Sequence, residues 1–130
     1  MNAYRFIRVG CLFLLVGFVL SFNGCAQPNL VLVDEAVTVG AGGDGSAPVF
    51  FSANAGQRIH IDLTGSANTA PYGHLEFPNG ESIYTPELSV TDNQTNSDGA
   101  VLPQTGQYTY VVFDSTNHGG TVNVRIELIQ

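Results

Sequence analysis

The chain has 130 residues, in which eleven Asp and Glu outnumber four Lys and Arg, and its formal net charge is −7 at neutral pH. This length fits one domain and a targeting segment. Such an acidic surface repels phosphate backbones, which excludes nucleic-acid binding, and it disfavours electrostatic docking on anionic lipid.

The N-terminus has the pattern of a secretory signal. Arg5 and Arg8 precede an apolar run from Val9 to Phe22. A membrane-spanning helix needs about 20 apolar residues, whereas the apolar core of a signal peptide has about 7–15. We therefore expect a signal peptide at residues 1–24, with an uncleaved anchor helix as the alternative.

The apolar run ends at a small residue that is followed at once by a cysteine. Phe22-Asn23-Gly24-Cys25 resembles the lipobox of bacterial lipoproteins. In that family the cysteine thiol is lipidated and the signal is removed before it, a reaction that uses the nucleophilicity of a thiolate. The resemblance implies a lipid anchor on Cys25. Cys11 lies inside the signal, so the mature domain has no thiol for a disulfide or a metal.

The chain after Cys25 divides into a short connection and one domain. Residues 25–29 show no periodicity, and we expect them to form the lipidated N-terminus and a tether, followed by the domain at residues 30–130. Apolar and polar residues alternate in Gln57–Thr64 and Thr121–Gln130, which predicts half-buried strands. Gln107–Asp114 is apolar on both faces near its end, as expected of a central, covered strand. Less regular strands are expected at Leu30–Val33, Ala36–Val39, Val49–Ala53, Gly73–Phe77 and Leu88–Thr91.

Turn sequences separate these strands at short intervals. They lie at Gly40–Gly45, Asn54–Gly56, Pro78–Gly80, Asn96–Gly99 and Asn117–Gly120. Glycine and asparagine tolerate the positive φ that tight turns require. No segment has helical periodicity bounded by caps. The pattern predicts an all-β fold, an antiparallel β-sandwich of jelly-roll type.

Three stretches together resemble the bacterial pre-peptidase C-terminal domain: Val49–Thr64, Leu75–Gly80 and Leu102–Val112. That family has a Phe-containing strand, an Ala-Gly turn into an alternating strand, a Pro-x-Gly turn and a Leu-Pro-x-x-Gly-x-Tyr segment. The resemblance covers about Val37 to Ile129. It implies a jelly-roll sandwich outside the cytoplasm that binds protein or carbohydrate, and it supplies no catalytic residues.

Two groups of residues have the types found in reactive sites. His60, His74 and His118 lack a ligand spacing typical of zinc sites, so we expect surface histidines. The segment from Asp114 through Ser115 to His118 contains the residue types of a hydrolase triad, but triad members come from separate elements. We expect a hairpin loop whose polar side chains bind nearby backbone amides.

A polar loop from Asp92 to Asp98 is rich in oxygen ligands. Calcium takes about six to eight oxygens from such loops, so a structural calcium is the alternative to a plain solvated turn, which we favour. Asp44, in the Gly40–Gly45 turn, is a weaker candidate for a calcium ligand. We predict no bound metal or cofactor. Asn93-Gln94-Thr95 fits the glycosylation sequon, which a bacterial lipoprotein is not expected to use.

Four tyrosines have the ring chemistry of a sugar-binding platform. We expect by default that each of these rings packs in the core or at an edge of the domain; they are Tyr72, Tyr84, Tyr108 and Tyr110. Tyr72 and Tyr84 lie near turns and are the better candidates for exposure.

The sequence therefore predicts a lipoprotein anchored to the membrane through Cys25, with a non-catalytic binding domain for protein or carbohydrate at the cell envelope. Ala26, which follows the cysteine, is compatible with the outer membrane or cell surface if the host is Gram-negative. The alternatives are a structural lipoprotein that assembles an envelope complex through its tether and sheet edges, and a hydrolase with an unrecognised site.

Overall fold

The computed structural model describes residues 27–42, 45–85 and 95–130. These residues form the strands β1 (Leu30–Val39), β2 (Ser46–Ala53), β3 (Arg58–Gly65), β4 (Pro71–Glu76), β5 (Ser82–Tyr84), β6 (Thr95–Val101), β7 (Gly106–Asp114) and β8 (Gly120–Ile129). No helix in these three ranges has the length and apolar character needed to cross a bilayer.

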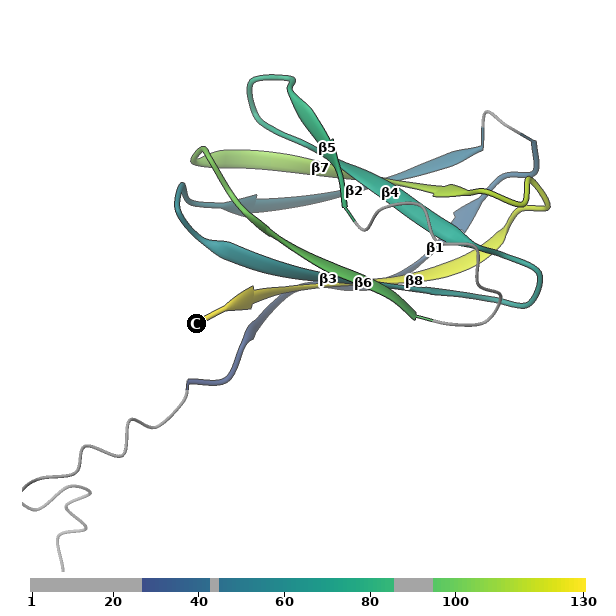
Figure 1. The fold of residues 1–130 in the computed structure, drawn as a ribbon, viewed down its shortest axis with the longest axis horizontal. Coiled ribbons are helices and arrows are strands. Elements are labelled where there is room, and N and C mark those ends of the chain that lie inside the picture. Colours follow the sequence, from purple (N-terminus) through teal and green to yellow (C-terminus); the bar gives the residue numbers. More distant parts are fainter. Residues whose placement is uncertain (1–26, 43–44, 86–94) are drawn as a thin grey trace, which may run out of the picture.

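Two four-stranded sheets stack face to face (Figure 1). One sheet has the order β1-β8-β3-β6 and the other β2-β7-β4-β5, with antiparallel pairing throughout. Apart from β4 and β5, consecutive strands alternate between the sheets. Eight strands wound in this way form a jelly roll, which confirms the predicted fold class.

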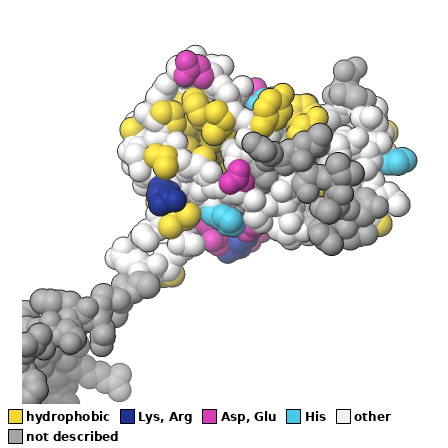
Figure 2. Space-filling model, viewed as in Figure 1, with side chains coloured by type: hydrophobic (Ala, Val, Ile, Leu, Met, Phe, Trp, Pro, Cys, Tyr) yellow, Lys and Arg dark blue, Asp and Glu magenta, His cyan; other side chains and the backbone are white. Residues whose placement is uncertain are grey.

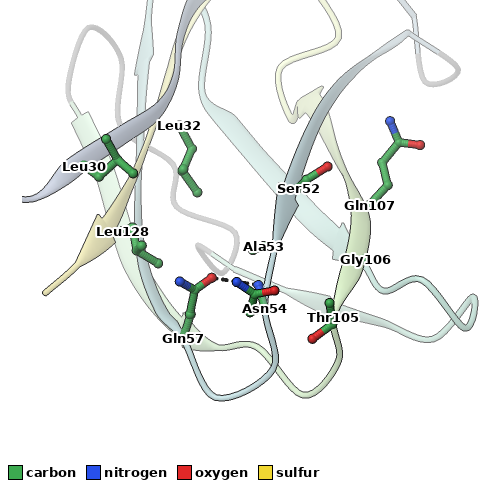
Figure 3. Close-up of a pocket in the computed structure, with 10 residues that line it drawn as sticks. All are labelled: Leu30, Leu32, Ser52, Ala53, Asn54, Gln57, Thr105, Gly106, Gln107 and Leu128. Atoms are coloured by element: carbon green, nitrogen blue, oxygen red, sulfur yellow. Dashed lines mark hydrogen bonds between the residues drawn. The ribbon is translucent and has the colours of Figure 1, made fainter.

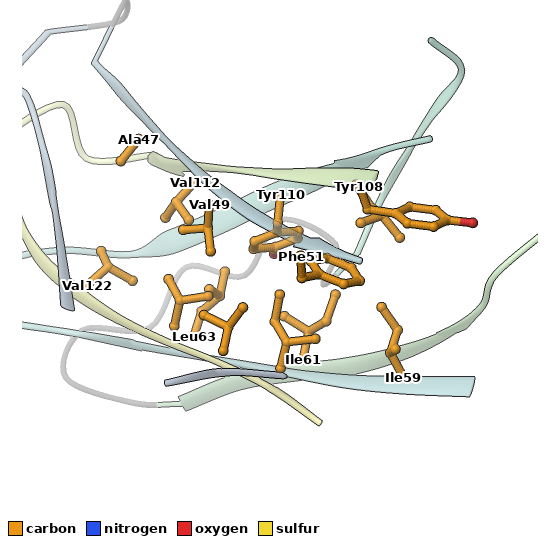
Figure 4. Close-up of a cluster of buried hydrophobic side chains, with 14 of the residues drawn as sticks. Ala47, Val49, Phe51, Ile59, Ile61, Leu63, Tyr108, Tyr110, Val112 and Val122 are labelled. Atoms are coloured by element: carbon orange, nitrogen blue, oxygen red, sulfur yellow. The ribbon is translucent and has the colours of Figure 1, made fainter. Parts of the chain in front are cut away.

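The core lies between the sheets and comes from one face of each strand. The members that are fully buried include Ile59, Ile61 and Leu63 of β3 and Val122, Val124 and Ile126 of β8. These are the inward residues that the alternation predicts. Tyr108, Tyr110 and Val112 of β7 meet them from the other sheet (Figure 4). Burial of each side chain of this size stabilises the fold by about 1.5–3 kcal/mol. Because this burial holds one face of every strand against the core, it also determines which face each strand turns outward.

A tyrosine closes one end of this core. The Tyr108 hydroxyl donates to the carbonyl of Gln104 and accepts from the Gln104 amide. The Tyr108 ring stacks on Phe51, with ring centroids 5.5 Å apart. The turn before Tyr108 is therefore fixed to the strand that follows it, β7.

Replacing Tyr108 with phenylalanine should lower the free energy of unfolding by about 1–2 kcal/mol, because both Gln104 backbone groups lose a partner while the ring packing stays. Denaturant titration of the two proteins measures this difference. Tyr72→Phe is the matched control, since it removes a hydroxyl from a half-buried tyrosine outside the core. Equal losses in the two variants would contradict the role of the Tyr108 hydroxyl.

The structure corrects three expectations about strands. β1 is one strand rather than two, with an irregularity in register between Val31 and Val33. β6 runs through Asn96–Gly99, which was predicted to be a turn, because its pairing with β3 supplies the backbone partners. β5 was not predicted at all. The expected strand Leu88–Thr91 lies outside the described residues.

The turns at Asn54–Gly56 and Pro78–Gly80 are where the sequence predicts them. Gly56 has φ 83° and Gly80 has φ 87°, which are left-handed values that favour glycine. The Gly56 amide donates to the carbonyl of Leu102, which joins the β2–β3 turn to the segment before β7. These turns lie at the end of the sandwich where the N-terminal segment leaves the domain (Figure 1).

Candidate functional site

The outward faces of the two sheets differ in chemistry. On the β1-β8-β3-β6 sheet, outward positions carry a ladder of charged side chains. Arg125 pairs with Asp34 at 2.7 Å and also with Glu127, and His60 pairs with Asp62 at 3.0 Å. Hydrogen bonds from Arg125 lower the pKa of Glu127. Exposed pairs of this kind keep the face hydrated and contribute little stability.

One part of the charged face contains a serine, a histidine and a carboxylate. Ser97 of β6 donates to Asp62 Oδ1 at 2.5 Å, and His60 Nε2 lies 3.0 Å from the same oxygen. In a hydrolase triad the imidazole lies between the serine and the carboxylate, so that it can take the serine proton. Here the carboxylate lies between the other two groups. This arrangement orders the surface but does not activate Ser97.

Part of the outward face of the β2-β7-β4-β5 sheet is apolar and aromatic. We call the following residues the aromatic face: Phe50, Tyr72, His74, Tyr84, Val111 and Phe113. Cross-strand pairing places Tyr72 beside Phe113, and His74 between Val111 and Tyr84. Figure 2 shows hydrophobic side chains gathered over this sheet at the top of the molecule. A half-solvated antiparallel sheet usually turns polar residues outward, so this face is exceptional.

Four rings of the aromatic face contact one another, those of Tyr72, His74, Tyr84 and Phe113. Tyr72 and Phe113 stack with centroids 5.3 Å apart, and His74 lies 5.3 Å from Phe113 and 5.7 Å from Tyr84. Tyr84 is 64% exposed on β5, and Phe50 is 59% exposed on β2. These two strands form opposite edges of the sheet, about 14 Å apart. Tyr84 lies against the half-buried cluster through His74, whereas Phe50 stands apart from it, in register with Thr109 of β7.

The aromatic face holds little charge. Among the described outward positions of this sheet, Glu76 is the only carboxylate, and none is Lys or Arg. The Glu76 carboxylate lies 2.9 Å from His74 Nε2. A surface with few charges and several rings loses little hydration free energy when a partner covers it.

The structure separates the four candidate tyrosines. Tyr84 is exposed and Tyr72 is half-buried, so both reach the surface, whereas Tyr108 and Tyr110 are fully buried. The Tyr110 hydroxyl has no hydrogen-bond partner among the described residues. Its pKa is raised, mainly because the group is buried and also because the negative charge of Asp98 is nearby. Phe50, His74 and Phe113 belong to the aromatic face but were not predicted as site residues.

A pocket of about 440 Å³ opens at the end of the sandwich near the start of β1 (Figure 3). It is lined by Leu30, Leu32, Ser52, Ala53, Asn54, Gln57, Thr105, Gly106, Gln107 and Leu128. The Gln57 side chain already accepts a hydrogen bond from the Asn54 amide. No lining residue has a titratable side chain, so the pocket offers contacts but no group for proton transfer.

The Asp114–His118 segment is a turn whose side chains bind nearby backbone amides, as expected, but it is not the predicted hairpin loop, because it joins β7 and β8 of different sheets. The Asp114 carboxylate accepts hydrogen bonds from the backbone amides of Ala70, Thr116 and Gly119 and from the Thr116 hydroxyl. Ser115 donates to the carbonyl of Ala70 rather than toward a histidine. Burial would raise the pKa of Asp114, but these hydrogen bonds outweigh it and hold the pKa below its ordinary value.

The candidate metal ligands do not converge in the described part of the chain. His60 lies on β3 and His74 on β4, which belong to different sheets, and His118 lies in the β7–β8 turn. No group of three or more His, Cys, Asp or Glu there is placed to hold a metal ion. Of the predicted Asp92–Asp98 loop, residues 92–94 lie outside the described residues, as do Asp44 and Asn93. The remainder belongs to β6, where Asp98 accepts a hydrogen bond from Thr85.

No protein-family model matches the chain, and no curated protein sequence matches it. Among solved structures, it is similar to the pre-peptidase C-terminal domain of collagenase from Bacillus anthracis, with 16% identity and a TM-score of 0.54 over 74% of this chain and 89% of that chain. It is also similar to Aeromonas hydrophila PliG, a periplasmic lysozyme inhibitor of g-type lysozyme, with 19% identity and a TM-score of 0.46 over 88% and 91% of the two chains. The first similarity confirms, for the fold, the resemblance predicted from the sequence.

Proposed function

We propose that this chain is a lipid-anchored protein of the cell envelope whose jelly roll is a non-catalytic binding domain, and that the aromatic face binds a protein partner. The observation that carries the proposal is the concentration of exposed and half-buried rings on one sheet face with a single described carboxylate, Glu76. Binding energy at protein interfaces concentrates in a few aromatic residues at the centre of the contact. Tyr84 and Phe50 are the exposed members that a partner would cover.

The packing of the rings favours a protein partner over a carbohydrate. A pyranose stacks on the free face of an aromatic ring. Tyr72 and Phe113 are inclined by only 22° and stack on each other, so each uses a ring face within the cluster. A partner protein can cover the exposed rings of Tyr84 and Phe50 without needing a flat platform.

The N-terminal sequence supports anchoring outside the cytoplasm. Phe22-Asn23-Gly24-Cys25 follows an apolar run of signal-peptide length and resembles a lipobox. Lipoproteins carry more than one acyl chain, and two chains are enough for stable membrane attachment. The domain would then begin a few residues from the bilayer.

Replacing Tyr84 with alanine should weaken partner binding by about 2 kcal/mol, or about 30-fold in affinity, since the ring is exposed at a binding face. A photo-crosslinking amino acid at position 84 of the full chain in intact cells identifies the partner, and titration with the purified partner measures the loss. Asn123→Ala is the matched control, because Asn123 is exposed on the opposite sheet.

Protein adducts formed equally from positions 84 and 123 would contradict the proposal. Tyr84-dependent binding to a purified envelope polysaccharide, with no protein adduct from position 84, would instead make carbohydrate the ligand. Thermal unfolding of each variant establishes that the fold is retained.

A further inference from the structure

One end of the sandwich gathers exposed hydrophobic side chains around the start of the chain. Four of the seven exposed large hydrophobic residues in the described ranges lie here: Leu30, Val31, Val101 and Ile129, at 51%, 40%, 60% and 41% exposure. They come from the start of β1 and the ends of β6 and β8. We call these four residues, together with Arg58, the tether end.

The tether end contains a cation that has no acidic partner in the described part of the chain. Arg58 is exposed at the start of β3, and its register partners on either side are Val101 of β6 and Ile129 of β8. Among the described residues, the other arginine, Arg125, is held by Asp34 and Glu127, whereas Arg58 forms no ion pair. Figure 2 shows a basic side chain beside hydrophobic ones near the point where the N-terminal segment leaves the domain.

This combination fits the interface of a phospholipid bilayer. Valine, isoleucine and leucine side chains enter the boundary between headgroups and acyl chains. A long basic side chain covers apolar surface with its stem and places its charge at the level of the lipid phosphates. Because apolar contact supplies the attraction, the acidic charge of the domain does not prevent it. The carboxylate nearest this end, Glu127 in register with Val31, is mostly buried and is paired with Arg125.

The chain outside the described residues leads from this end. The Asn29 side chain donates to Glu127 of β8 at 3.2 Å, so the domain holds the chain at Asn29. Four residue steps separate Asn29 from Cys25, a span of at most about 14 Å when fully extended. A folded partner, whose radius of gyration is about 13 Å for 100 residues, does not fit between this end and the membrane.

We propose that the tether end itself contacts the phospholipid surface, so that the sandwich sits directly on the bilayer and does not swing freely on its tether. This rests on the anchoring at Cys25 put forward above. It also assigns a role to Arg58, Val101 and Ile129, which the aromatic face does not use. The far end of β1, where Thr38 is exposed, would point away from the membrane.

The test uses the full lipidated chain in vesicles of phosphatidylethanolamine and phosphatidylglycerol that contain a nitroxide-labelled phospholipid. A fluorophore is attached to the single free thiol of Val101→Cys or, as the matched control, of Thr38→Cys. Thr38 lies about 27 Å farther along β1 than Leu30. We expect the lipid nitroxide to quench the label at position 101 and to leave the label at position 38 unquenched.

A further variant with two added substitutions distinguishes contact with the lipid surface from mere proximity to it. Arg58→Glu with Ile129→Ser, added to Val101→Cys, should reduce quenching to the level of the position 38 control while the protein stays in the vesicles. Unchanged quenching in this variant, or equal quenching at positions 101 and 38, would overturn the proposal. Wild-type protein that does not incorporate into vesicles would instead contradict anchoring at Cys25, so the two failures are distinguishable.

Discussion

A chain carrying Cys25→Ser should move from the membrane fraction to the soluble fraction of the cell. The serine hydroxyl is a far weaker nucleophile than a cysteine thiolate near neutral pH, so no lipid would be attached. The apolar run from Val9 to Phe22 is shorter than the roughly 20 residues that a stable membrane span requires. Fractionation followed by mass spectrometry of the N-terminus measures both localisation and processing.

Cys11→Ser is the matched control for this experiment. Cys11 lies within the apolar run rather than after it, so its replacement should leave both lipidation and membrane attachment unchanged. If the Cys25→Ser protein remains in the membrane with its starting methionine, residues 1–24 form an uncleaved anchor and the lipoprotein proposal is wrong. The wild-type N-terminus should carry the mass of a diacylated or triacylated cysteine.

Replacing Asp114 with alanine should lower the free energy of unfolding by about 3 kcal/mol, because three backbone amides and a hydroxyl lose a charged acceptor. Asp114 is only 6% exposed, so water does not replace the lost partner. For a domain of about 100 residues this corresponds to a fall in Tm of about 15 °C. Calorimetry measures the change, and Asp34→Asn, on an exposed ion pair, should shift Tm little.

The contribution of Asp114 should depend on pH in a defined direction. Its pKa is lowered in the folded protein, while in the unfolded chain an aspartate has a pKa of about 3.9. The stabilisation is therefore complete above the unfolded pKa and is lost as the pH falls through the lower, folded pKa. The difference in unfolding free energy between wild type and Asp114→Asn should shrink as the pH falls from about 5 to about 3. A difference that stays constant over this range would show that the carboxylate charge is not what the turn requires.

The strands that were predicted well are those whose burial alternates strictly. In β3 and β8 one face is fully buried and the other is polar, so the period-two pattern is visible in the sequence. β6 could not be recognised, because its residues Thr95–Val101 lie at a sheet edge, are mostly exposed and include a glycine. Its strand conformation comes from pairing with β3, a contact that local sequence does not encode.

The candidate site was harder to predict than the fold. Tyr84 and Tyr72 were identified as the better candidates for exposure, but Val111 and Phe113 were interpreted as signs of a strand covered on both faces. β7 is central in its sheet, yet in the described part of the chain no further layer covers its outward side. The outward apolar residues of β7 were thus the available signal for the aromatic face, and only the sheet order shows that Tyr72 and His74 lie beside them.

Pro48 and Glu35 affect how neighbouring copies of this chain can associate. Pro48 lies within β2 and Glu35 within β1, and each of these strands forms the border of its sheet. Pro48 has no amide hydrogen, and Glu35 is a carboxylate paired in register with the buried Val124. Both features obstruct the addition of a strand from a neighbouring molecule. Copies that meet side-on along β1 and β2 should remain separate folded units instead of joining into continuous sheets.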